Sequence, residues 1–155
     1  MSTLGDLLLP NAILPRARWQ GRKQVLTEMS AMMANALGLD QRKVYEAVQE
    51  RERLGSTGVG EGVAIPHARI ECLKRPVGGF VRLIEPADFE AIDDRKADLV
   101  FMLLAPTDDG AEHLRALARA ARAFRLEKIR SALRQAQTAE AVLAILAPGA
   151  VIDAA

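Results

Sequence analysis

Cysteine is almost absent from this sequence, and histidine is nearly as scarce. Cys72 is the only cysteine among 155 residues, so an internal disulfide framework is excluded, which suits a reducing cytosol. His67 and His113 are the only histidines, and a metal site would need carboxylates to complete its ligands. We therefore expect no metal, no cofactor and a cytoplasmic location.

Long apolar runs and an excess of charge are missing as well. The longest apolar run, residues 99–105, is too short to cross a bilayer, and no basic segment precedes Leu7–Leu9 as it would in a signal peptide. Lys and Arg total 21 against 20 Asp and Glu, which gives no argument for nucleic acid or an anionic membrane. With 50% hydrophobic residues, residues 1–155 are expected to form a single domain without membrane insertion.

Glycine is concentrated in one stretch, RERLGSTGVGEGVAIPHAR, at residues 51–69. Four of the 11 glycines lie there, and backbone N–H groups in such a loop can converge on an anion. The apolar residues 63–65 indicate a buried strand, which Pro66 ends just before His67. A histidine at a strand end, facing a glycine loop with Arg51 upstream, indicates phosphoryl chemistry. Composition alone leaves open a glycine-rich hairpin that binds nothing.

Two nucleotide-binding motifs fail in this stretch. Gly55 and Gly60 have the spacing of a P-loop, but Glu61 occupies the position of the required lysine. The dinucleotide fingerprint also fails, since its third glycine would fall on Val63 or Ile65. We therefore expect no nucleotide site here.

The whole chain alternates helical and strand patterns, which predicts an α/β fold with helices on both faces of a sheet. Short strands are predicted at residues 12–14, 63–65, 79–84 and 98–104, with a helical turn over 4–9 and a polar connector over 69–76. Helices are predicted over residues 21–37, 41–52, 111–125, 127–135 and 139–146. The third helix is expected to bury Leu114, Leu117, Ala121 and Phe124, with the arginines at 115, 119, 122 and 125 facing solvent.

Two long motifs resemble one protein family. RERLGSTGVGEGVAIPH (residues 51–67) and DLVFMLLAPTDDGAEHLRALARAAR (residues 98–122) resemble the enzyme IIA components of the bacterial phosphotransferase system. The nearest branch is the nitrogen-regulatory type, with fructose- and mannitol-type IIA domains as relatives. The resemblance covers nearly the whole chain and implies a mixed, mostly parallel sheet of about five strands. One departure is Ala68, where the family often has glycine.

The resemblance also implies residue roles. His67 would carry the phosphoryl group, with Arg51 and His113 as its catalytic partners. The hydroxyls of Ser56 and Thr57, with the N–H of Gly58, would bind phosphate. Because a neutral imidazole nitrogen attacks phosphorus, the other ring nitrogen of His67 needs a fixed partner, which the sequence does not identify. His113 follows the most buried strand in the first turn of a helix, so we expect it to donate to His67 or to its phosphoryl group.

The resemblance further implies the function of a phosphotransferase component. It would accept a phosphoryl group from an HPr-like protein and regulate partner proteins. Members of the nitrogen-regulatory branch act on potassium transport and on sensor kinases. The alternative is a sugar-specific IIA component that passes phosphate to a IIB domain. The absence of an attached IIB sequence or membrane segment favours the first reading. A regulatory protein whose histidine is never phosphorylated is disfavoured by the set of Arg51, His67 and His113. A hydrolase using Ser56 lacks the Gly-x-Ser-x-Gly elbow.

Overall fold

The structure, a computed structural model, describes residues 4–108 and 110–148 as alternating strands and helices. The strands are β1 (Leu8–Ala17), β2 (Gly58–Gly60), β3 (Val63–Ala64), β4 (His67–Ile70), β5 (Val77–Ala87) and β6 (Ala97–Pro106). The helices are α1 (Gly21–Leu37), α2 (Gln41–Leu54), α3 (Gly110–Arg125), α4 (Glu127–Gln135) and α5 (Ala139–Leu146). Within these ranges, every helix is too short or too polar to cross a membrane.

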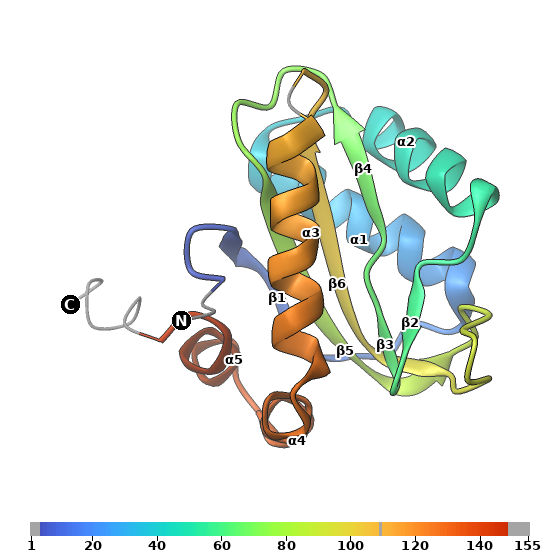
Figure 1. The fold of residues 1–155 in the computed structure, drawn as a ribbon, viewed down its shortest axis with the longest axis vertical. Coiled ribbons are helices and arrows are strands. Elements are labelled where there is room, and N and C mark those ends of the chain that lie inside the picture. The colour runs from blue at the N-terminus through green and yellow to red at the C-terminus, as the bar shows by residue number, and fades with distance from the viewer. Residues whose placement is uncertain (1–3, 109, 149–155) are drawn as a thin grey trace.

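The described strands form one mixed sheet of six strands (Figure 1). Their order is β1-β5-β6-β3-β2, and β4 also pairs with β6. The β1–β5, β3–β6 and β4–β6 pairs are parallel, whereas the β5–β6 and β2–β3 pairs are antiparallel. The prediction of a mixed, mostly parallel sheet is therefore confirmed.

The sixth strand arises because β3 and β4 are two pieces of one extended segment. Paired residue numbers differ by 36 in both pieces, as in Val63 with Leu99 and His67 with Leu103. The register is therefore unbroken across Ile65 and Pro66. Pro66 has no N–H to donate, but its carbonyl accepts the N–H of Leu103 at 2.9 Å. The place of His67 in the sheet is thus set by its pairing with β6.

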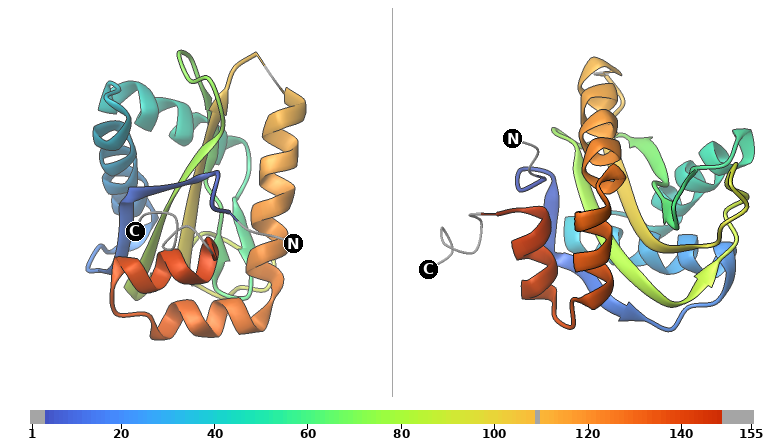
Figure 2. Two further views of the ribbon diagram at one scale, coloured as in Figure 1. Left: turned by 90° about the vertical axis from the view of Figure 1, so that its left-hand side faces the viewer. Right: turned by 60° about the horizontal axis from the view of Figure 1, so that its bottom comes forward.

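Helices cover both faces of the sheet, as predicted (Figures 1 and 2). Helices α1 and α2 pack on one face, and α3, α4 and α5 pack on the other. The side chains of β6 alternate between the two cores. Val100, Met102 and Leu104 point to the α1–α2 side, and Leu99, Phe101 and Leu103 point to the α3 side. This strand is buried on both faces, which accounts for its continuous apolar sequence.

Strand β1 is longer than the predicted strand at residues 12–14, so the predicted bounds are wrong. The strand runs through both Pro10 and Pro15, and residues 5–7 form a turn before it. It is the first strand in the sheet order and pairs with β5 alone among the described strands, with irregular register near both prolines. An edge strand tolerates proline because the missing N–H can face away from the sheet.

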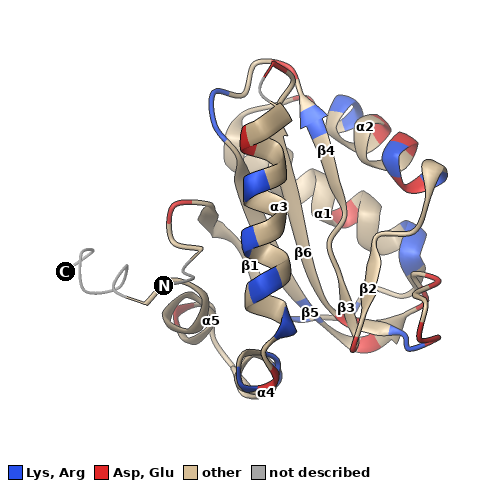
Figure 3. Cartoon of the chain, viewed as in Figure 1, with Lys and Arg blue, Asp and Glu red and all other residues tan. Residues whose placement is uncertain are grey.

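The buried face of α3 also differs from the predicted stripe. The residues buried there are His113, Ala116, Ala120, Ala123 and Phe124, whereas the side chain of Leu114 is 67% exposed. Small alanine side chains let α3 lie close to the sheet. Relative to the predicted stripe, the helix is rotated about its axis, and this rotation turns the side chain of His113 inward. Arg115, Arg122 and Arg125 are exposed as predicted, and Figure 3 shows basic residues spaced along the outer side of α3.

Candidate functional site

His67 is oriented by the backbone just before it. Its Nδ1 lies 2.8 Å from the carbonyl oxygen of Ile65. Because a carbonyl oxygen only accepts, this contact requires that Nδ1 carries the proton and leaves the lone pair on Nε2. The side chain is half-buried, at the first residue of β4. Ile65 is therefore the fixed partner that the sequence did not identify.

Arg51 lies in the last turn of α2 and reaches the other nitrogen of the same ring. Its Nε donates to Nε2 of His67 at 3.1 Å, and its Nη1 donates to the carbonyl oxygen of Gly55 at 2.8 Å. The helix ends at Leu54, and its C-terminal carbonyls favour a cation in the last turn. The guanidinium is thus held between the helix end and the lone pair of His67.

His113 lies in the first turn of α3 and faces His67. The two ring centroids are 5.5 Å apart, with an interplanar angle of 76°. The Nδ1 of His113 accepts from Nε of Arg69 at 3.4 Å, so the proton of its neutral ring is on Nε2. This Nε2 is buried without a hydrogen-bond partner among the described residues, and His113 as a whole is 7% exposed. A buried donor without an acceptor is costly in a folded protein, and it suits a site that is filled by a ligand.

The surroundings of both histidines lower their pKa values, which favours the neutral rings. Burial lowers the pKa of His67 below its ordinary value of 6.5, the hydrogen bond to Ile65 opposes this shift, and the charge of Arg51 adds to it. Burial also lowers the pKa of His113, and the charge of His67 when protonated lowers it further, as do the charges of Arg69 and Arg51. A neutral His67 is the form that has a nucleophilic nitrogen.

Arg69 is a site residue that the sequence reasoning missed, because residues 69–76 were predicted to form a polar connector. The first part of that segment is instead β4, in which His67 and Arg69 lie two residues apart. Residues at this spacing point to the same face of a strand. Extending the predicted strand beyond Pro66 would therefore have placed Arg69 beside His67, on the face that α3 covers.

The loop between α2 and β2 binds mainly to its own surroundings. The hydroxyl of Ser56 donates to the carbonyl oxygen of Phe89 and accepts from the N–H of Gly58. Thr57 is buried, and both its N–H and its hydroxyl donate to the carboxylate of Glu52. The structure thus brings together Arg51, His67 and His113. It directs the polar groups of Ser56, Thr57 and Gly58 to protein partners.

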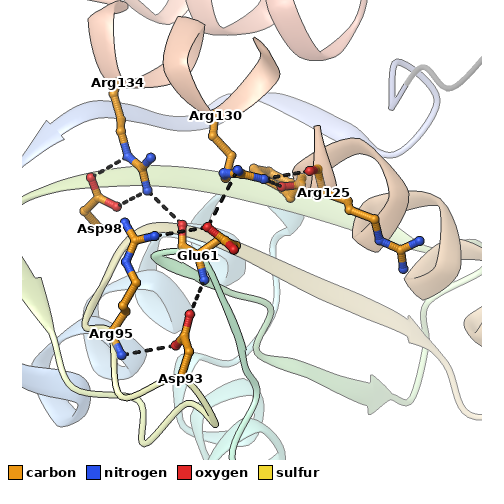
Figure 4. Close-up of polar contacts among 8 residues, drawn as sticks. Glu61, Asp93, Arg95, Asp98, Arg125, Arg130 and Arg134 are labelled. Carbon is orange, nitrogen blue, oxygen red and sulfur yellow. Dashed lines mark hydrogen bonds and ion pairs between the residues drawn. The ribbon is translucent and has the colours of Figure 1, made fainter. Parts of the chain in front are cut away.

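The far end of the glycine hairpin is anchored by ion pairs, which Figure 4 shows. Glu61, at the tip between β2 and β3, has a positive φ of 59°. Its N–H donates to Asp93 at 2.8 Å, and its carbonyl oxygen accepts from Arg134 of α4 at 3.0 Å. Arg134 also donates to both carboxylate oxygens of Asp98 at 2.9 Å. The strand that leads to His67 is therefore fixed at its start as well as by its pairing.

The described residues contain no group of three or more His, Cys, Asp or Glu side chains that could hold a metal ion. The site brings together two imidazoles and two guanidinium groups. This set suits a dianion bonded to one imidazole, because each remaining side chain is a hydrogen-bond donor.

Comparison with known proteins identifies the family of this chain. The model of the family described as "Phosphoenolpyruvate-dependent sugar phosphotransferase system, EIIA 2" matches residues 6–148. The chain belongs to this family. The expected resemblance is thus confirmed, and the EIIA type 2 match includes Arg51, His67 and His113.

Several EIIA relatives resemble the chain over most of its length. A nitrogen regulatory protein of Bradyrhizobium diazoefficiens is 46% identical over 142 residues, which cover 92% of this chain and 93% of that protein. The crystal structure of nitrogen regulatory protein IIA-Ntr from Neisseria meningitidis has a TM-score of 0.86 and 36% identity, covering 92% of this chain and 98% of that one. A fructose-specific EIIA component of Haloferax volcanii is 34% identical over 148 residues, covering 95% and 94%.

Proposed function

We propose that this protein carries a phosphoryl group on Nε2 of His67 and accepts it from an HPr-like phosphocarrier protein. The observation that carries this proposal is the state of that nitrogen. The carbonyl oxygen of Ile65 accepts the N–H of Nδ1, so the lone pair remains on Nε2, where it accepts from the guanidinium of Arg51. A neutral imidazole held in this tautomer, with a cation at its nucleophilic nitrogen, suits attack on an anionic phosphoryl group.

The exchange needs few chemical parts. The Nε2 lone pair of His67 forms a bond to phosphorus while the nitrogen–phosphorus bond of the donor breaks. The electron pair of the broken bond stays on the imidazole nitrogen of the donor. Because one phosphohistidine replaces another, catalysis depends on positioning and on stabilising charge. Arg51 releases Nε2 as phosphorus approaches, and its N–H groups then donate to the phosphoryl oxygens.

His113 is proposed to be a donor to the same group. Its Nε2–H has no partner within residues 4–108 and 110–148, and it belongs to a ring centred 5.5 Å from that of His67. A phosphoryl group brings about −1.5 to −2 charge and three strong acceptor oxygens, so it would satisfy this buried N–H. His113 would thus stabilise the phosphorylated state without itself becoming the nucleophile.

The glycine loop is assigned a supporting role. A phosphate-binding role for Ser56, Thr57 and Gly58 stays a prediction, because each would first have to release its present partner. Their hydrogen bonds instead hold the loop against α2 and the segment that contains Phe89. A rigid loop keeps Arg51 and His67 in place for transfer.

We further propose that phosphorylation changes how the protein binds its regulatory partners. Relatives with the same family domain are named nitrogen regulatory proteins. Two large apolar side chains next to site residues are exposed, Leu54 by 77% and Leu114 by 67%. Apolar groups beside a site that gains negative charge suit a partner that distinguishes the two states. The alternative, passage of phosphate to a IIB domain, is favoured by the likeness to a fructose-specific component.

Phosphorylation by enzyme I, an HPr-like carrier and radiolabelled phosphoenolpyruvate tests the proposal. The protein should gain one acid-labile phosphoryl group, and ³¹P NMR should assign it to Nε2 of His67. The variant His67→Ala should stay unlabelled, whereas His113→Ala should be labelled more slowly. Equal labelling of His67→Ala and the unaltered protein would show that the nucleophile lies elsewhere. Rapid transfer from the labelled protein to a purified fructose-type IIB domain would favour the alternative.

A further inference from the structure

We propose that Arg69 is a positioning residue that holds His113 in the tautomer required to donate to the phosphoryl group. This inference rests on the proposed function of His67. It concerns Nδ1 of His113, which accepts from Nε of Arg69 at 3.4 Å.

A neutral histidine has two tautomers, and His113 is useful in only one of them. With the proton on Nε2 the ring can donate to a phosphoryl oxygen, whereas with the proton on Nδ1 it would present a lone pair to a dianion. A guanidinium has N–H groups and no acceptor, so a bond to Nδ1 excludes the second tautomer. Among the described residues Nε2 of His113 has no hydrogen-bond partner, so the contact from Arg69 is what selects the tautomer of this ring.

The fold holds Arg69 where this contact can form. Arg69 pairs with Ala105 near the end of β6, and α3 begins a few residues later at Gly110. A Cβ atom on Gly110 would lie 3.2 Å from Nη2 of Arg69, so the guanidinium rests against the start of α3. Figure 1 shows the end of β4 and the start of α3 at the same end of the molecule. His67 and Arg69, both in β4, therefore lie next to His113.

The presence of only two histidines makes the tautomers directly measurable by NMR. In ¹⁵N-labelled, unphosphorylated protein at a pH of about 8, where both rings are neutral, long-range ¹H–¹⁵N spectra report which ring nitrogen carries the proton. We expect Nδ1–H for His67 and Nε2–H for His113. In Arg69→Met, the His113 signals should move to values averaged over both tautomers. Arg69→Lys should restore part of the unaltered pattern, because an ammonium also donates.

A matched control is available at Arg53. Its side chain is 66% exposed and forms an ion pair with Glu50, so Arg53→Met removes the same charge without touching either histidine. The control should leave both tautomers unchanged. If His113 keeps a pure Nε2–H tautomer in Arg69→Met, or if Arg53→Met shifts it equally, Arg69 does not position this ring.

Phosphorylation kinetics provide the second readout. Loss of one hydrogen bond to a partner of the phosphoryl group should slow labelling of His67 by about fivefold in Arg69→Met, with partial recovery in Arg69→Lys. Unchanged labelling rates would overturn the inference even if the tautomer shifts. Failure of the unaltered protein to become labelled would instead refute the proposed function, and the tautomer measurements are independent of that result.

Discussion

Replacing Glu52 with glutamine is expected to destabilise the fold by about 2 kcal/mol, because this carboxylate ties the glycine loop to α2. Glu52 is 9% exposed. Its Oε1 accepts the hydroxyl of Thr57 at 2.6 Å, its Oε2 accepts the N–H of Thr57 at 3.2 Å, and Arg22 lies 3.4 Å from Oε2. The amide nitrogen of glutamine would face one of these donors instead of accepting from it.

The expected magnitude follows from the buried donors of Thr57. A buried donor left without an acceptor costs about 1–3 kcal/mol, and the ion pair with Arg22 adds less because the arginine is partly exposed. Thr57→Val removes only the hydroxyl and should cost about 1 kcal/mol. Since both changes disrupt the same bond, the double variant should be more stable than the sum predicts, by about 0.5 kcal/mol or more.

Urea unfolding followed by circular dichroism measures these free energies of unfolding. Glu50→Gln is the matched control, since Glu50 lies on the same helix with a side chain that is 62% exposed and bound to Arg53. It should change stability by less than about 0.5 kcal/mol. If Glu52→Gln is no more destabilising than Glu50→Gln, or if the double variant is strictly additive, the carboxylate does not hold the loop.

Three further results are expected. Arg51→Lys should slow labelling of His67 by about tenfold, because lysine lacks the planar fork, and an unaltered rate would reduce Arg51 to a helix-end charge. Burial lowers the pKa of His67 and His113 below 6.5 in the folded state. As the pH falls through 6.5, the unfolded state therefore binds more protons than the folded state, and the free energy of unfolding should decrease. Urea titrations should show a smaller decrease in the free energy of unfolding when both histidines are replaced by glutamine. A decrease equal to that of the unaltered protein would contradict this account. Arg134→Met should lower stability by about 1 kcal/mol and speed amide exchange at the hairpin tip, and unchanged exchange would show that the tip is held otherwise.

Helix boundaries were predictable where capping residues next to the helix mark them in the sequence. The pattern over residues 21–37 ends at Gly38, whose φ of 71° is a glycine conformation, and α1 has those bounds. Asp40 precedes α2 and caps it, because its carboxylate accepts the backbone N–H of Arg42 at 2.9 Å. The bounds of α4 and α5 also agree with the prediction. In each case neighbouring residues contain the signal.

Features that depend on distant partners were not predictable in this way. Alanines occur on several sides of α3, so periodicity did not show that the helix turns His113 inward and leaves Leu114 exposed. The length of β1 depends on its place at the sheet edge, which only the strand order reveals. The family motifs predicted that Arg51, His67 and His113 belong together. The carbonyl of Ile65 and the guanidinium of Arg69 became visible only with the backbone in place.

The unbroken pairing of β3 and β4 with β6 limits which insertions and deletions this protein can tolerate. From Val63 to Ile70 every paired residue keeps the same offset from its partner on β6. Adding or deleting one residue near Pro66 would shift β4 by one position, and a shift of one turns each following side chain to the opposite face of a strand. His67 would then face the α1–α2 core, away from His113. Between Val63 and His67, chain length is therefore as strict a requirement as residue identity.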